Sequence, residues 1–164
     1  MLISTSELFG APVMSLQTGS EVAETATCII DPKTLHIVAY ELEGSKLDVH
    51  PAFVKIEDLR ELSDIGFIID SSDEVISLDD IVVAKELYEQ PLVLEGMKVV
   101  DTDTNKLGKV EQAIMDTDSF QIEQLHVKRP FLKSLSDTNL ILNRSQIVDV
   151  RDDTIVVRSA KVKA

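Results

Sequence analysis

The chain has 164 residues, of which 44% are hydrophobic and 27% charged, with one cysteine and a formal net charge of −13. This composition suits a globular protein with a modest core. The single cysteine excludes an internal disulfide and indicates a reduced, cytoplasmic setting. No apolar run approaches the roughly 18 residues that a membrane span requires. Residues 1–90 hold 5 Lys/Arg against 18 Asp/Glu. Because this half carries the whole net charge, it disfavours direct nucleic-acid binding and favours a basic protein partner, although acidity can also serve solubility alone.

The first half of the chain is predicted to form short β-strands that continue to Ile76, with a late polar turn at residues 70–74. Its clearest segment reads apolar, x, apolar, x, x, apolar, x, apolar and comprises Leu35, Ile37, Tyr40 and Leu42. A plain strand alternates with period two, so the change of phase after Ile37 predicts a bulge or bend.

A short helix is predicted at residues 77–91, between the two halves. Ser77 followed by Asp80 resembles a capping box, and Pro91 marks the end. The apolar residues recur at helical spacing, which predicts that one side of the helix packs on a β module. They are Ile81, Ala84, Leu87 and Tyr88.

The second half shows a series of strand and turn patterns. Val99 and Val100 end a first strand, residues 101–106 form a polar turn, and a second strand runs from Leu107 to Met115. After a turn at residues 116–119 come strands at 120–127, 140–142 and 155–157. Several short strands separated by turns predict a small barrel or rolled sheet, because closure removes exposed strand edges.

The two halves are related by an internal repeat. Ile29, Ile30 and Asp31 match residues 114–116 at a spacing of 85, and the irregular apolar pattern at 35–42 recurs at 120–127. Upstream residues match at a spacing of 86, which indicates one residue gained or lost in a turn. The sequence therefore predicts a mainly β chain of two tandem modules, at residues 1–76 and 92–164, joined by the helix.

Several residues of the second module resemble the PRC-barrel family, the small β-barrel of the photosynthetic reaction-centre H subunit and of RimM-type ribosome maturation factors. They are Gly96, Val99, Leu107, Gly108, Lys109, Val110, Asp116, Leu140 to Leu142, Ser145, Gln146, Ile147 and Val148. In the first module Val22 and Ala23 replace the Leu-Gly pair, which indicates either that the backbone freedom of glycine is not needed there or that the turn is altered. The chain is thus similar to a tandem pair of PRC-like β-barrels.

The resemblance implies a non-enzymatic adapter that docks on a protein partner in a larger assembly, since the family carries no catalytic residue set. Two alternatives remain. One is a ribosome maturation-like protein that contacts a basic small-subunit ribosomal protein, by analogy with the family. The other is a sensor that binds a small ligand or ion between the barrels.

No metal, cofactor or catalytic site is predicted. Asp101, Asp103 and Asn105 resemble the opening of an EF-hand loop, but Lys106 and Gln112 replace its glycine and its bidentate glutamate, so a polar hairpin turn explains these residues better. The three histidines are isolated, and no nucleophile motif is present.

The basic segment at residues 128–135 is the candidate partner-binding site, because the two modules differ most at this connection. Its apolar residues could form a contact ringed by cations, or could fold back to close the end of the barrel. The candidate residues are Lys128, Arg129, Phe131, Leu132, Lys133 and Arg144.

Overall fold

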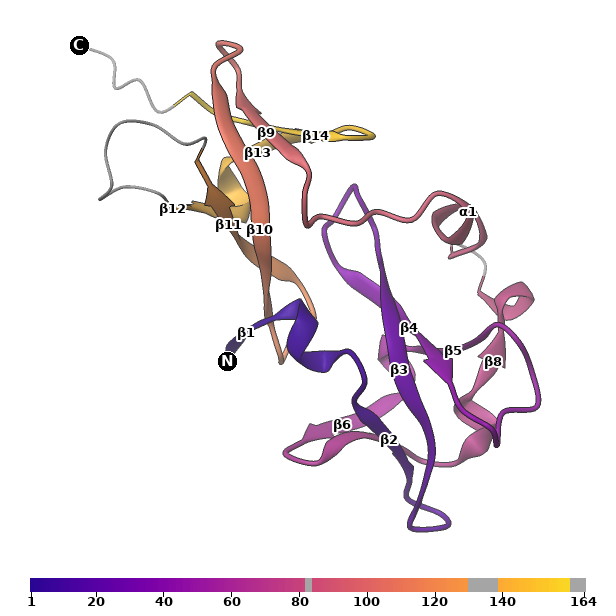
Figure 1. The fold of residues 1–164 in the computed structure, drawn as a ribbon. Coiled ribbons are helices and arrows are strands. Elements are labelled where there is room, and N and C mark those ends of the chain that lie inside the picture. The colour runs from indigo at the N-terminus through magenta and orange to yellow at the C-terminus, as the bar shows by residue number, and fades with distance from the viewer. Residues whose placement is uncertain (82–83, 130–138, 160–164) are drawn as a thin grey trace. The chain divides into compact units, whose positions relative to one another are not determined.

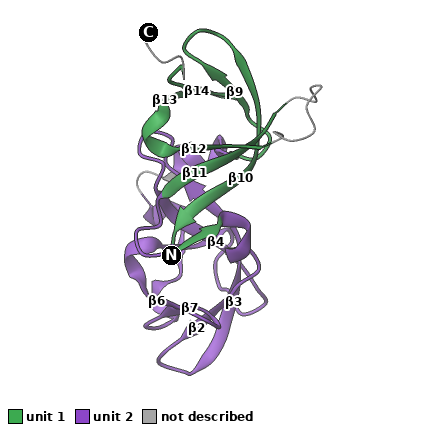
Figure 2. Cartoon of the chain, turned by 90° about the vertical axis from the view of Figure 1, so that its left-hand side faces the viewer, with its two compact units in different colours: residues 1–4, 93–116, 122–164 green, residues 5–92, 117–121 purple. Residues whose placement is uncertain are grey.

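The structure is a computed structural model that describes residues 1–81, 84–129 and 139–159. It divides into two compact units (Figures 1 and 2). Unit 1 contains Met1–Ser4, Val93–Asp116 and the chain from Ile122 onward, and unit 2 contains Thr5–Leu92 and Thr117–Gln121. Each unit therefore includes a short segment from the other half of the sequence.

Unit 2 is built on a seven-stranded sheet with the order β6-β7-β2-β3-β4-β5-β8. Neighbouring strands are antiparallel except for β2 and β7, which are parallel. The strands are β2 (Pro12–Ser15), β3 (Ser20–Ile30), β4 (Ile37–Glu43), β5 (Ala52–Lys55), β6 (Leu59–Ser63), β7 (Gly66–Ile69) and β8 (Ile76–Ser77). Four short 3₁₀ helices also belong to this unit: η1 (Thr5–Leu8), η2 (Ile56–Asp58), η3 (Ser72–Glu74) and η4 (Leu78–Asp80).

Unit 1 repeats this topology in the order β12-β11-β10-β9-β14-β13, with the parallel pair now between β9 and β14. The strand β1 (Leu2–Ser4), from the start of the chain, pairs antiparallel with the end of β10. The other elements are β9 (Lys98–Asp101), β10 (Lys106–Asp116), β11 (Ile122–Lys128), β12 (Asn139–Asn143), η5 (Arg144–Gln146), β13 (Ile147–Val150) and β14 (Thr154–Val157). The expected mainly β chain of two curled, barrel-like sheets with a short helix between them is confirmed.

The bulge predicted from the apolar pattern is present in both units. In unit 2, Ile29 pairs with Ala39 and Ile30 with Ile37, so Val38 is an additional residue of β4. In unit 1, Glu123 is the additional residue of β11 at the equivalent place. The residues that open the two patterns, Leu35 and Phe120, both adopt a left-handed backbone, with φ of 58° and 56°, and both are buried. The repeat therefore extends to single backbone conformations.

The segment after β8 packs on unit 2 as expected, but the helix begins later than predicted. Ser77 does not cap a helix, because its hydroxyl donates to the Asp80 carboxylate at 3.2 Å instead of accepting from a backbone amide. The chain forms η4 there, and α1 covers only Ala84–Glu89. Ile81 joins a buried cluster with residues of β3, β4 and β5, and the ring of Tyr88 packs edge-on against Phe53 with centroids 5.4 Å apart.

Candidate functional site

A row of lysines crosses three neighbouring strands of unit 1. Lys109 on β10 lies directly opposite Lys98 on β9 and directly opposite Lys128 on β11. All three side chains are exposed. Residues directly opposite each other in an antiparallel pair share a face of the sheet, with Cβ atoms about 5 Å apart. Three positive charges are thus held side by side by strand pairing.

A bulge adds a fourth lysine to the same face. Lys106 pairs with Val100 and Gly108 pairs with Val99, so Leu107 is an additional residue in β10. Lys98 and Val100 are two residues apart on β9 and therefore share a face. The bulge accordingly brings Lys106 onto the face of the lysine row, whereas in a regular strand two residues three positions apart would point to opposite faces.

Unit 2 has the same arrangement with the opposite charge. Glu24 on β3 lies directly opposite Glu43 on β4, and a bulge at Val22 places Glu21 opposite Met14. At the repeat spacing of 85, these three glutamates correspond to the three lysines of β10 and β11. Each unit therefore carries like charges at one equivalent place, acidic in unit 2 and basic in unit 1.

In unit 2 the glycine that replaces that of the Leu-Gly pair stands on the facing segment of chain, at Gly44 directly after β4, and not on β3. In unit 1, a Cβ on Gly108 would collide with the backbone oxygen of Lys128. In unit 2, Ala23 occupies the equivalent position and the residue across from it is Gly44, where an added Cβ would lie 3.4 Å from the Cα of Ala23. The close approach of the two backbones thus remains in both units with one glycine in each, which explains why the sequence of the first module departs from the pattern.

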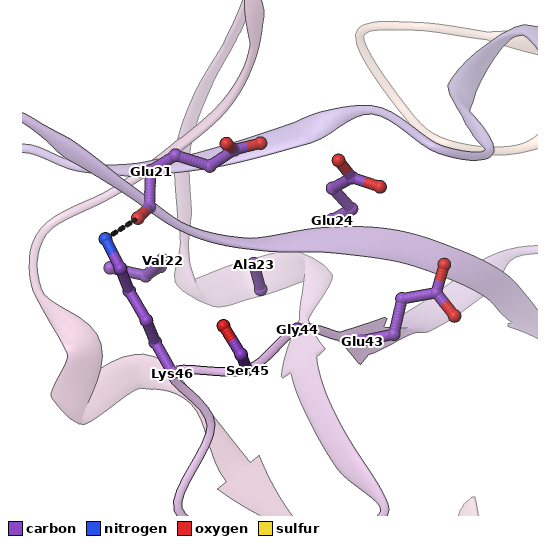
Figure 3. Close-up of a pocket in the computed structure, with 8 residues that line it drawn as sticks. All are labelled: Glu21, Val22, Ala23, Glu24, Glu43, Gly44, Ser45 and Lys46. Carbon is purple, nitrogen blue, oxygen red and sulfur yellow. Dashed lines mark hydrogen bonds between the residues drawn. The ribbon is translucent and has the colours of Figure 1, made fainter.

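Each charged surface borders a cavity. The cavity of unit 2 has a volume of about 360 Å³ and is lined by Glu21, Glu24, Glu43 and their neighbours (Figure 3). The ammonium of Lys46 reaches back to the carbonyl of Glu21 at 3.2 Å. The cavity of unit 1 has a volume of about 450 Å³ and its charged lining is entirely basic. Its lining residues are Lys98, Val99, Val100, Lys106, Gly108, Lys109, Lys128 and Arg129.

The structure brings together only part of the candidate set named from the sequence. Lys128 and Arg129 line the cavity of unit 1. Arg144 does not lie beside them: it follows β12 and its guanidinium is 3.9 Å from the carboxylate of Glu123, near the start of β11, whereas Lys128 ends that strand. The remaining candidates, Phe131, Leu132 and Lys133, lie outside the described residues.

Three residues of the basic surface were missed from the sequence, namely Lys98, Lys106 and Lys109. Two of them could have been found by comparing the charges of the two repeats, because Lys106 and Lys109 correspond in sequence to Glu21 and Glu24. Lys98 could not, because its partnership with Lys109 depends on the register of β9 against β10.

The acidic turn at residues 101–106 serves the hairpin between β9 and β10. Asp101 is buried, and its Oδ1 accepts hydrogen bonds from the backbone amides of Asp103 and Asn105, both at 2.9 Å. The side-chain amide of Asn105 donates to Oδ2 of Asp101 at 3.0 Å. These bonds occupy the oxygens that a cation would need, in agreement with a polar hairpin turn. The described residues contain no group of three or more His, Cys, Asp or Glu side chains arranged for a metal ion.

The comparison with protein families concerns the second half of the chain. Residues 94–163 match the family model of the PRC-barrel domain. The second half of the chain is a PRC-barrel domain. The match covers β9 to β14 and confirms the resemblance carried by Gly96, Leu107, Gly108 and the residues around Ile147. The lysine surface therefore belongs to the PRC-barrel itself.

The chain also aligns with a solved structure. This structure, from Pseudomonas aeruginosa, is described as the 16S ribosomal RNA processing protein RimM and is 16% identical in sequence. The alignment covers 97% of this chain and 98% of that chain, with a TM-score of 0.32. No curated protein matches the sequence. Within the described ranges, no helix has the length and apolar character needed to cross a membrane.

Proposed function

We propose that this chain is a non-enzymatic adapter that docks on a protein partner within a larger assembly. The observation that supports the proposal is the reversal of charge between Glu21, Glu24 and Glu43 and their counterparts Lys106, Lys109 and Lys128. If these side chains had a purely structural role, we would expect the same type of side chain at equivalent positions of both sheets. Opposite charges on equivalent strands instead suit two surfaces that recognise different partners.

The acidic surface of unit 2 favours a basic protein segment as its occupant. Glu24 and Glu43 are held opposite each other, so a cation that approaches both experiences two attractions at once. The first half of the chain carries the whole net charge of −13, which adds long-range attraction for a basic partner and raises the rate of encounter. We infer a cytoplasmic protein with functional modules at residues 1–76 and 92–164 and a connection at 77–91.

A ribosome maturation-like role is the specific form of adapter that the PRC-barrel resemblance suggests. Ribosomal proteins are basic, so the acidic surface of unit 2 would suit one of them electrostatically. Cosedimentation with small ribosomal subunits or their precursors at low salt is the measurement that separates this role from other adapters. Absence from those fractions would exclude the ribosomal role and leave the general adapter open to the experiment below.

The adapter proposal is tested by affinity purification of the tagged full chain, followed by identification of stoichiometric partners. We expect a partner with a basic contact surface that is lost when Glu21, Glu24 and Glu43 are all replaced by Gln. The interaction measured with the purified partner should weaken with added salt, because exposed charges are screened over about 10 Å at 0.1 M.

A matched control removes the same number of negative charges from a part of unit 2 outside the acidic cavity. Asp79, Glu86 and Glu89 are exposed acidic residues of η4 and α1 outside the acidic cavity, and the triple variant with Asn, Gln and Gln at these positions should retain the partner. Equal loss of binding in both triple variants would show that net charge alone attracts the partner. Recovery of no stoichiometric partner would contradict the adapter function.

A further inference from the structure

Within the described part of the chain, most cations of the basic surface of unit 1 have no acidic partner, although the protein as a whole is acidic. Among the described residues, Lys106, Lys109, Lys128 and Arg129 make no ion pair within 4.0 Å. Other cations of the chain do find carboxylates, for example Lys55 with two of them. Within the cavity lining only Lys98 does so, at 3.9 Å from Asp153. Sequence composition alone would favour the opposite result, since Asp and Glu number 29 against 16 Lys and Arg.

Strand pairing makes this arrangement costly in the absence of an anion. Like charges directly opposite each other on neighbouring strands destabilise a sheet. Lys109 has a lysine opposite it on both sides, Lys98 on β9 and Lys128 on β11. The bulge at Leu107 turns Lys106 toward the same face, which adds to the repulsion. Departures of this kind from the stable local arrangement are expected where a surface has a function.

We propose that the basic cavity of unit 1 binds a compact phosphate-bearing anion, of the size of pyrophosphate or a small phosphorylated molecule. A polyvalent anion neutralises several lysines at once, which a single carboxylate cannot do. Arg129, which also lines the cavity, can offer a planar donor pair that matches two phosphate oxygens. Val100, on the same face of β9 as Lys98, gives the cavity an apolar wall for the body of a ligand.

The dimensions and the overall charge both favour a compact ligand over a nucleic acid. A volume of about 450 Å³ lies in the range of small-molecule sites. A nucleic-acid backbone would extend beyond the lysines and would experience the net charge of −13 of the whole chain. The glutamates at the equivalent place in unit 2 would repel the same ligand, so one site per chain is expected.

The experiment measures binding of pyrophosphate to the full chain by isothermal titration calorimetry at constant ionic strength. We expect one site per chain, with affinity reduced at least tenfold in the double variant Lys109→Gln, Lys128→Gln. The control Glu24→Gln, Glu43→Gln changes the equivalent pair in unit 2 and should leave the affinity unchanged. Inorganic phosphate should bind more weakly than pyrophosphate, because it engages fewer lysines.

A second measurement keeps the proposal testable if neutralisation alters the fold. Without ligand, the double lysine variant should melt at or above the temperature of the wild-type chain, because a repulsion has been removed, and added pyrophosphate should raise the melting temperature of the wild type only. The same rise in both proteins, or the same rise with potassium chloride or citrate at equal ionic strength, would overturn the proposal. The proposal of a compact ligand would be overturned if a twelve-nucleotide single-stranded DNA bound more tightly than pyrophosphate and if this DNA binding were lost in the double lysine variant. None of these results depends on whether the chain is an adapter.

Discussion

The ring of Phe120 meets the ring of Tyr40 edge-on, with centroids 6.3 Å apart and an interplanar angle of 79°, although the two residues come from opposite halves of the sequence. Phe67 lies against both, at 4.9 Å from Tyr40 and 6.2 Å from Phe120. All three are buried. The backbone of the same turn also takes part, since the amide of Ile37 donates to the carbonyl of Phe120 at 2.8 Å. The β10–β11 turn, formed by residues of the second half, thus completes the core of unit 2.

Replacing Phe120 with Ala should lower the free energy of unfolding by about 3–5 kcal/mol, because it removes a buried aromatic ring and leaves a cavity. The measurement is urea unfolding followed by circular dichroism. The control is Phe9→Ala in the same unit, where the side chain is 37% exposed and a loss of less than about 1 kcal/mol is expected. A similar loss in the two variants would contradict the role of Phe120 in the core.

Tyr40 should make the stability of the protein fall at alkaline pH. Burial, with a smaller contribution from Cys28, raises the pKa of the Tyr40 phenol far above its ordinary value of about 10. Above that pH the unfolded chain releases the phenolic proton and the folded chain retains it, so the free energy of unfolding declines by up to about 1.4 kcal/mol per pH unit.

The check on this prediction is urea unfolding at several pH values between 8 and 12. Tyr40→Phe should reduce the alkaline slope, whereas the lysines titrate in both proteins and cancel in the comparison. Burial and the Glu41 carboxylate also raise the pKa of Tyr88, but its side chain is partly exposed, so Tyr88→Phe should change the slope less. An unchanged slope in Tyr40→Phe would show that other groups account for the alkaline loss.

Gly108→Ala should destabilise unit 1 by more than the usual cost of a glycine at positive φ. Its φ is 143°, and the added methyl group would overlap the backbone oxygen of Lys128. We expect a loss of roughly 2–4 kcal/mol, since the strands β10 and β11 would have to separate. Gly96→Ala is the matched control, because its φ of 87° is also positive but no atom lies within 4 Å of the added Cβ.

The control should cost only about 1 kcal/mol, the penalty for an L residue in this conformation. The difference between the two variants therefore measures the close approach of the two strands. Thermal unfolding of both proteins under one set of conditions provides it. Equal losses would show that backbone conformation, and not the contact with Lys128, explains the glycine.

Much of the fold could be predicted because the local spacing of apolar residues along the chain indicates its strands. The shared interruption at 35–42 and 120–127 predicted a bulge, and Val38 and Glu123 are its additional residues. The helix start was wrong because a serine and an aspartate three residues apart can bond to each other as well as cap a helix, and Ser77 bonds to Asp80. Of the candidate site, Lys128 and Arg129 were named, whereas Lys98, Lys106 and Lys109 were not.

The sequence by itself determined the two β modules, their repeat spacing and the basic character of the segment that begins at Lys128, because periodicity and composition are properties of short stretches of chain. Only the tertiary structure decided that Lys98, Lys109 and Lys128 stand in one row and that Phe120 belongs to the core of unit 2. Strand register and the packing of a distant turn depend on pairing between remote segments. A shift of one residue would move every side chain to the other face, and no local pattern specifies that choice.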